Sequence, residues 1–124
     1  MKLSLTVEAD APGELTVEDP LPRTARLNGI QCSTAHITGE DNTILDQVTL
    51  HRHDGGDSDW ILHTGYGYLL RLSARLYPVL ELKRMGLSKD CRQLVATLMQ
   101  RYEIDILHLD AAGNLLSGFS TFDW

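Results

Sequence analysis

Alternating apolar and polar positions predict β-strands in several parts of the chain. Leu3–Val7 and Gly29–Ser33 carry apolar side chains at every second position, which is the spacing of a half-buried strand. The aromatic and aliphatic run Trp60–Leu72 is centred on Thr64-Gly65 and predicts a β-hairpin. Residues 104–109 are apolar with little polar interruption, which favours a central strand.

A period of three to four residues, together with capping residues, predicts helices in three places. Thr38 followed by Asp41 resembles a capping box, so a helix is expected directly after them. Pro78 suits the first turn of a helix that ends at Gly86, because proline favours helix starts and glycine favours helix ends. Ser88 is expected to cap the next helix. There the apolar residues recur at helical spacing: Cys91, Leu94, Val95, Leu98, Met99 and Tyr102.

These elements predict a single α+β domain over residues 1–124. We expect a mostly antiparallel sheet of about five strands, with two or three helices packed on one face. Residues 1–29 are interpreted as an N-terminal extension that contributes a β-hairpin. The expected core consists of Leu3, Leu5, Val7, Ile30, Ile44, Leu45, Val48, Trp60, Leu69, Leu94, Val95, Leu98, Ile106, Leu107 and Phe122.

Composition and charge exclude several classes of protein. No stretch approaches the roughly eighteen consecutive apolar residues of a membrane helix, and the N-terminus lacks the apolar segment of a signal peptide. The cytoplasm is therefore the expected location. The net charge is −6, which argues against direct nucleic-acid binding because phosphates attract basic surfaces. Basic residues are concentrated between 71 and 101, where we interpret them as the solvated faces of amphipathic helices.

Three polar residues between a predicted strand and a predicted helix are the candidate catalytic group. His36 could act as a general base, with Ser33, Thr34 or Cys32 as the nucleophile. The alternative is structural: the hydroxyl groups bond to backbone at the helix start, and the imidazole packs or caps. Neighbours in sequence rarely provide a nucleophile and its base, so we favour the structural interpretation.

Metal and cofactor binding have little support in the sequence. His51, His53 and Asp54 lie in a polar loop with two adjacent glycines and are the candidate metal ligands. A zinc site needs three or four converging ligands, so an ordinary surface loop is the favoured interpretation. The glycines at 65 and 67 lack the lysine and hydroxyl residue of a phosphate loop. We expect no cofactor.

Aromatic residues near the middle and the end of the chain are the candidate binding residues: Tyr66, Tyr68, Phe119 and Trp124. Chain ends are usually polar and loosely held, whereas this one is aromatic. We therefore expect the last six residues to dock on the fold or on a second copy of the chain, because large aromatic side chains gain free energy by burial.

Four segments carry a resemblance to a known family. They are the run from Cys32 through Ser-Thr-Ala-His-Ile to Thr38, the triplet Tyr66-Gly67-Tyr68, the strand ending in Asp110, and the C-terminal Asp123-Trp124. Over roughly residues 30–124 the chain resembles a family of small uncharacterised bacterial proteins, a domain of unknown function found largely on plasmids and prophages. Where the family pattern has a second aspartate after Asp110, this chain has alanine.

The resemblance implies a setting in a mobile genetic element, of phage or plasmid, but no activity. A small phage anti-CRISPR protein also carries a Ser-Thr-Ala-His run. We therefore expect a non-enzymatic protein-binding role, either as an anti-defence inhibitor of a host complex or as a regulator, since acidic inhibitors can imitate phosphates. The alternative is a small enzyme that uses His36 with Ser33, Thr34 or Cys32. A protein partner is expected, without direct nucleic-acid or membrane binding, and a homodimer is left open.

Overall fold

The main body of the protein is built on a four-stranded mixed sheet with the strand order β3-β6-β5-β4. The computed structural model describes residues 4–6, 14–16, 21–50 and 58–124. In the sheet, β3 (Gly29–Ser33) runs parallel to β6 (Ile106–Asp110), β5 (Gly67–Arg71) runs antiparallel to β6, and β4 (Ile61–His63) runs antiparallel to β5. The predicted α+β class and the central position of the strand after residue 104 are confirmed.

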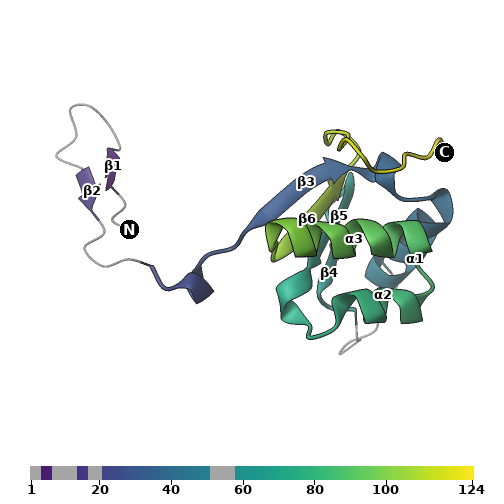
Figure 1. Ribbon diagram of the computed structural model, residues 1–124, viewed down its shortest axis with the longest axis horizontal. Coiled ribbons are helices and arrows are strands. Elements are labelled where there is room, and N and C mark those ends of the chain that lie inside the picture. The colour runs from purple at the N-terminus through teal and green to yellow at the C-terminus, as the bar shows by residue number, and fades with distance from the viewer. Residues whose placement is uncertain (1–3, 7–13, 17–20, 51–57) are drawn as a thin grey trace.

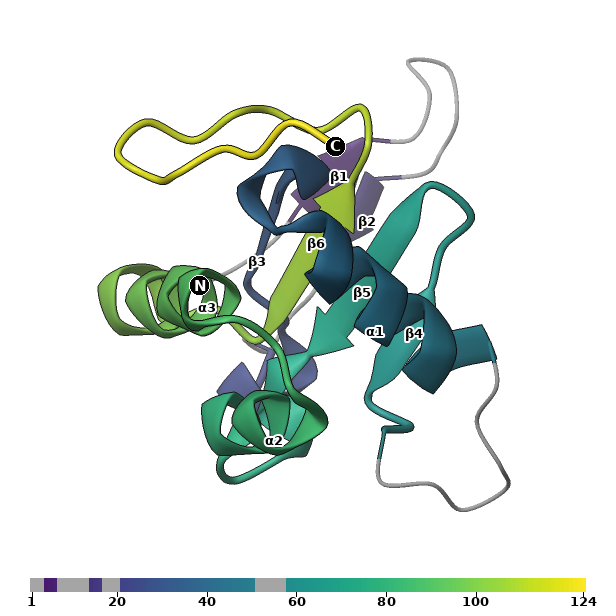
Figure 2. The same cartoon turned by 90° about the vertical axis from the view of Figure 1, so that its right-hand side faces the viewer.

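Three helices cover one face of this sheet (Figure 2): α1 (Gly39–Leu50), α2 (Pro78–Met85) and α3 (Lys89–Tyr102). Their ends follow local chemistry, as predicted. Gly86 ends α2 with a φ of 98°, and the Ser88 hydroxyl oxygen accepts a hydrogen bond from the Cys91 N–H at the start of α3. None of the described helices is long and apolar enough to cross a membrane.

The predicted capping box at the start of α1 is present and reaches further than the sequence suggested. Thr38 Oγ1 accepts a hydrogen bond from the Asp41 N–H at 3.0 Å, and Asp41 Oδ2 accepts one from the Thr38 N–H at 3.1 Å. The same carboxylate also accepts hydrogen bonds from the N–H and the hydroxyl group of Ser88, at 2.7 and 2.6 Å. Asp41 is fully buried, and it thus joins the first turn of α1 to the first turn of α3.

Apolar side chains of the sheet face the helices in a row across the strands. This row runs from Ile30 through Leu107 and Leu70 to Ile61. The expected core position Leu69 belongs to the opposite face of the sheet and is only half-buried. Both neighbours of Leu69 in the sequence are also apolar. The local sequence therefore has no alternation that shows which face of the sheet Leu69 takes. Six expected core residues are fully buried: Leu45, Trp60, Leu94, Val95, Leu98 and Leu107.

The remaining core predictions are met in part. Ile30, Ile44 and Val48 are partly buried against the core, and Ile106 and Phe122 are half-buried. The side chains of Leu3, Leu5 and Val7 lie outside the described part of the chain. The core also contains residues that the sequence analysis did not include: Cys32, Ile37, Ile61, Tyr68, Leu70, Leu72, Leu82, Leu87, Cys91, Ile104 and Leu109.

The N-terminal strands form a sheet of their own (Figure 1). β1 (Ser4–Thr6) pairs antiparallel with β2 (Glu14–Thr16). The main sheet accordingly has four strands, whereas about five were expected. The described part of the connection to β3 contains a short 3₁₀ turn, Arg23–Ala25, without a buried residue. It joins the main body at Asn28, whose N–H donates to Asp105 Oδ2 at 3.0 Å.

Two glycines allow the close backbone contacts that shape the end of the molecule near the C-terminus. A Cβ atom on Gly67 would lie 1.7 Å from the carbonyl oxygen of Leu109, and one on Gly113 would lie 2.5 Å from that of Cys32. Neither backbone atom can move aside without separating strands. These contacts bring the start of β5 and the turn after β6 against the end of β3, where the candidate residues lie.

Candidate functional site

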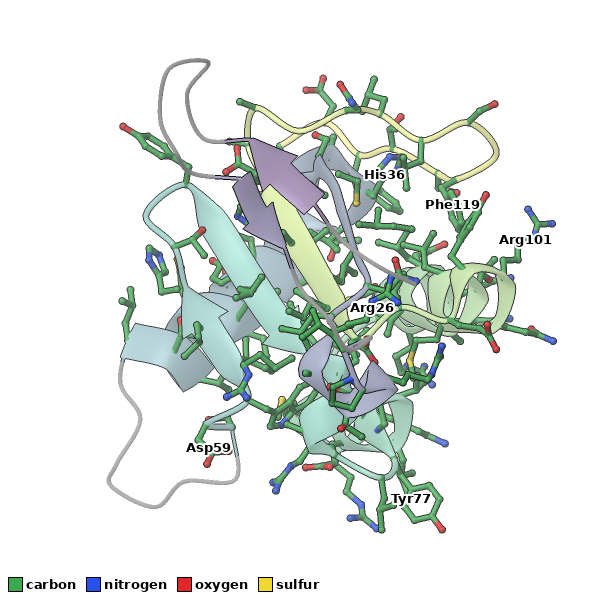
Figure 3. The ribbon with its side chains drawn as sticks, turned by 90° about the vertical axis from the view of Figure 1, so that its left-hand side faces the viewer. Arg26, His36, Asp59, Tyr77, Arg101 and Phe119 are labelled. Atoms are coloured by element: carbon green, nitrogen blue, oxygen red, sulfur yellow. The ribbon has the colours of Figure 1, made fainter. Side chains whose placement is uncertain are left out.

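His36 is buried, and its ring holds the C-terminal segment in place (Figure 3). Its Nε2 accepts a hydrogen bond from the Leu116 N–H at 2.8 Å, and its Nδ1 lies 2.9 Å from the Ser120 carbonyl oxygen. Because Nε2 accepts, the neutral ring carries its proton on Nδ1 and donates it to Ser120. Both ring nitrogens are therefore used by the backbone of the chain itself, and neither is free to transfer a proton.

The rest of the C-terminal segment docks beside His36, as predicted. The Phe122 N–H donates to the Ala35 carbonyl at 2.7 Å, and the Trp124 indole N–H donates to the Ile37 carbonyl at 2.8 Å. Phe119 packs edge-on against the His36 ring, with centroids 6.0 Å apart, and contributes to the core. The segment is therefore held by both backbone hydrogen bonds and aromatic packing.

Ser33 has a structural role, and the two cysteines are buried with raised thiol pKa values. The Ser33 hydroxyl oxygen accepts the Ala35 N–H at 3.0 Å and so caps the 3₁₀ turn Thr34–His36. Burial raises the pKa of the Cys32 thiol to about 11, and burial followed by the charge of Asp41 raises that of Cys91 to about 12. Since thiolates are the reactive form, both cysteines are poor nucleophiles at neutral pH.

A cavity of about 610 Å³ lies between α1, the β4–β5 connection and the end of the chain. It brings together three of the four candidate binding residues, Tyr66, Tyr68 and Trp124, with Ser33 and Thr34 also in its wall. The fourth, Phe119, lies instead in a smaller cavity of about 390 Å³, between the C-terminal segment and α3, which also contacts His36 and Arg101. In Figure 3, the Phe119 label lies between those of His36 and Arg101.

Four polar side chains form a network in the wall of the larger cavity. The Tyr68 hydroxyl donates to Asp46 Oδ1 and lies 2.8 Å from Asn42 Oδ1. His63 Nδ1 accepts the Gly65 N–H at 3.1 Å, so the proton of the neutral ring is on Nε2, which is 3.6 Å from Asp46 Oδ1. Burial, and then the hydrogen bond and charge of Asp46, raise the pKa of Tyr68 above its ordinary value. The phenol therefore stays neutral and acts as a donor.

The comparison with protein families identifies the unit that carries this site. A model described as "Family of unknown function (DUF5983) C-terminal domain" matches residues 29–124. The chain belongs to this family. The matched unit of DUF5983 begins at the first residue of β3 and includes the whole main sheet, the three helices and the docked C-terminal segment. The predicted membership in a family of unknown function is thereby confirmed. The chain matches no curated protein and no solved structure.

Sequence reasoning missed three residues of the DUF5983 domain that shape the larger cavity: Asn42, Asp46 and His63. Asn42 and Asp46 are one helical turn apart, so they share a face of α1. This spacing was the one local signal that could have indicated a shared polar site. His63 is at the end of β4 and had no sequence signal. Its ring is perpendicular to that of Tyr68, with centroids 5.5 Å apart.

Metal binding is not supported by the described residues. The candidate ligands His51, His53 and Asp54 lie outside the part of the chain that the structure describes. Within residues 4–6, 14–16, 21–50 and 58–124, no group of three or more histidine, cysteine, aspartate or glutamate side chains is placed to hold an ion.

Replacement of His36 by alanine should lower the free energy of unfolding by about 1–3 kcal/mol, because the buried ring and its hydrogen bonds to the Leu116 N–H and the Ser120 carbonyl are lost. Thermal or urea unfolding measures the change. His108→Ala is a matched control, since His108 Nε2 makes no hydrogen bond with the described residues and lies 3.6 Å from Asp110 Oδ2. Equal unfolding midpoints for the two variants would show that His36 does not hold the C-terminal segment.

Proposed function

We propose that this DUF5983 chain is a non-enzymatic, cytoplasmic binding protein of a mobile genetic element, which docks on a protein partner as an inhibitor of a host defence complex or as a regulator. The observation that carries the proposal is the use of both His36 ring nitrogens by the backbone at Leu116 and Ser120. The alternative, an enzyme with His36 as its base, would require the C-terminal segment to leave that ring.

An exposed aromatic surface supports a role in binding. Tyr66 is 78% exposed and Trp124 is 55% exposed, and both lie at the cavity of about 610 Å³. Apolar surface that is gathered in one place on a soluble protein often marks an interaction site, and these two rings share one cavity wall. Tyrosine and tryptophan are also the residue types that most often dominate the binding energy of protein interfaces.

The charge of this surface favours a protein over a nucleic acid as the partner. Asp46 and Asp123 lie in the wall of the cavity, and no lysine or arginine is among the described residues that line it. Such a surface repels phosphates and attracts basic side chains. The setting in a mobile element, and with it the anti-defence role, draws its support from the resemblance to plasmid and prophage proteins.

Affinity capture from the native host, using the full chain as bait, tests this proposal. We expect Tyr66→Ala to recover at least about tenfold less of the partner than the wild type, since an aromatic anchor at an interface often contributes 2 kcal/mol or more. Tyr77→Ala is the matched control: Tyr77 is 68% exposed and lies at the opposite end of the molecule from His36 (Figure 3).

Several results would overturn the proposal. One is equal recovery by all three baits, and another is recovery of nothing beyond a bait-free control. Retention of nucleic acid by the purified chain at low salt, with steep loss as salt is added, would contradict the choice of a protein partner. Sedimentation of the purified chain measures its size in solution. A dimer would show that the partner is a second copy of the chain, and a monomer would favour a foreign protein.

A further inference from the structure

We propose that the cavity between α1, the β4–β5 connection and the C-terminus receives a cationic side chain, arginine or lysine, of the partner. The inference rests on the proposed function and names the chemistry of its binding site.

The carboxylates of the cavity keep negative charge that the described residues do not neutralise. The Asp46 side chain is 42% exposed. Its contacts with Tyr68 and His63 both use Oδ1, and Oδ2 has no hydrogen-bond partner among the residues that the structure describes. Asp123 is exposed and lies in the same wall. Two carboxylates with no lysine or arginine among the described residues of the cavity wall attract a cation and disfavour an anion.

The aromatic side chains in the cavity wall, Tyr66 and Trp124, favour a cation as well. A guanidinium or ammonium group gains energy when it lies over the face of a tryptophan or tyrosine ring. Trp124 is held before any ligand arrives, because its indole N–H bonds to the Ile37 carbonyl and its Cβ packs on Gly39, where a glycine leaves room for it. A ring that is fixed and half-exposed loses little conformational freedom on binding.

The size of the cavity fits a long side chain, and its set of ligand atoms does not fit a zinc ion. About 610 Å³ lies within the roughly 300–1,000 Å³ typical of small-ligand sites, so a long side chain fits together with its flanking peptide. A zinc ion needs three or four nitrogen, sulfur or carboxylate ligands, whereas no group of three or more such side chains among the described residues is placed to hold an ion.

Titration of the ¹⁵N-labelled full chain with N-acetyl-arginine amide and N-acetyl-lysine amide tests this inference by NMR. N-acetyl-citrulline amide has nearly the shape of the arginine probe without its charge. We expect saturable shifts at the Trp124 indole N–H, at Gly65 and at Tyr66 with one or both cationic amides, and none with the citrulline amide. Added salt should weaken the binding because the carboxylates are exposed. The more effective of the two cationic probes identifies the preferred side chain.

Variants of the cavity wall should reduce this binding by a modest factor. Asp123→Asn and Tyr66→Leu should each weaken the affinity about two- to fivefold, as expected for an exposed ion pair or cation–π contact. Tyr77→Leu, remote from the cavity, should leave it unchanged. Equal shifts with the citrulline amide, shifts elsewhere in the chain, or no saturable shift would overturn the inference.

The two proposals fail in distinguishable ways. If the cationic amides do not bind and capture of the partner still depends on Tyr66, the surface binds a partner through other chemistry and only the cation site is wrong. If the amides bind but capture is unaffected by Tyr66→Ala, the cavity takes a cation and the proposed docking function is wrong.

Discussion

Replacing Asp41 by alanine is expected to lower the free energy of unfolding by at least about 3 kcal/mol, a large share of the roughly 5–15 kcal/mol that stabilises an ordinary domain. The Asp41 carboxylate is fully buried and accepts hydrogen bonds from the Thr38 N–H and from both the N–H and the hydroxyl of Ser88. Hydrogen bonds to a charged group are worth more than neutral ones, and each buried donor left without a partner adds a penalty. Urea unfolding followed by circular dichroism measures the loss.

Asp90→Ala is the matched control for this prediction. Asp90 also lies in the first turn of a helix, so its removal changes the charge and the helix-dipole interaction in the same way, but its side chain is exposed. We expect a cost of no more than about 1 kcal/mol. If the two alanine variants unfolded at the same urea concentration, Asp41 would not join α1 to α3.

Ending the chain after Gly118 is expected to lower the free energy of unfolding by about 2–4 kcal/mol, more than His36→Ala alone. The truncation removes the Ser120 carbonyl from His36, the Phe122 N–H from the Ala35 carbonyl, and the Trp124 indole from Ile37. It also removes three aromatic side chains, of which Phe119 packs against the core. Thermal unfolding measures the loss, and sedimentation shows whether the size in solution changes.

Leu115→Ala provides the control for the truncation. Leu115 belongs to the same C-terminal segment and is 64% exposed, so its replacement should change the unfolding midpoint very little. A truncated chain with the wild-type midpoint and the wild-type size would show that residues 119–124 neither complete the core nor form an interface between copies.

Local chemistry in the sequence was sufficient to place the helices. Thr38 and Asp41 predicted the start of α1, Gly86 the end of α2, and Ser88 the start of α3, and the structure confirms all three. Each of these signals works through hydrogen bonds or backbone angles within four residues. The same holds for the β4–β5 hairpin, which depends on the turn between two neighbouring apolar segments.

The tertiary structure alone decided which side of the sheet each apolar residue takes. Tyr68, Leu69 and Leu70 form a continuous apolar run, and only the pairing of β5 with β6 shows that the middle residue faces away from the helices. The parallel pairing of β3 with β6 joins segments more than seventy residues apart. No local pattern specifies which of two distant strands becomes a neighbour, because that choice depends on packing of the whole chain.

The same division applies to the candidate site. Residue types suggested that Ser33, Thr34 and His36 share one turn and that the aromatic end of the chain docks, and both are observed. The hydrogen-bond partners of the His36 ring are 80 and 84 residues away in the sequence. Likewise, the cavity unites Asp46, Tyr66 and Trp124 from three separate segments. Hydrogen bonds and cavities of this kind form only once the folded backbone brings distant segments together, so residue order cannot reveal them.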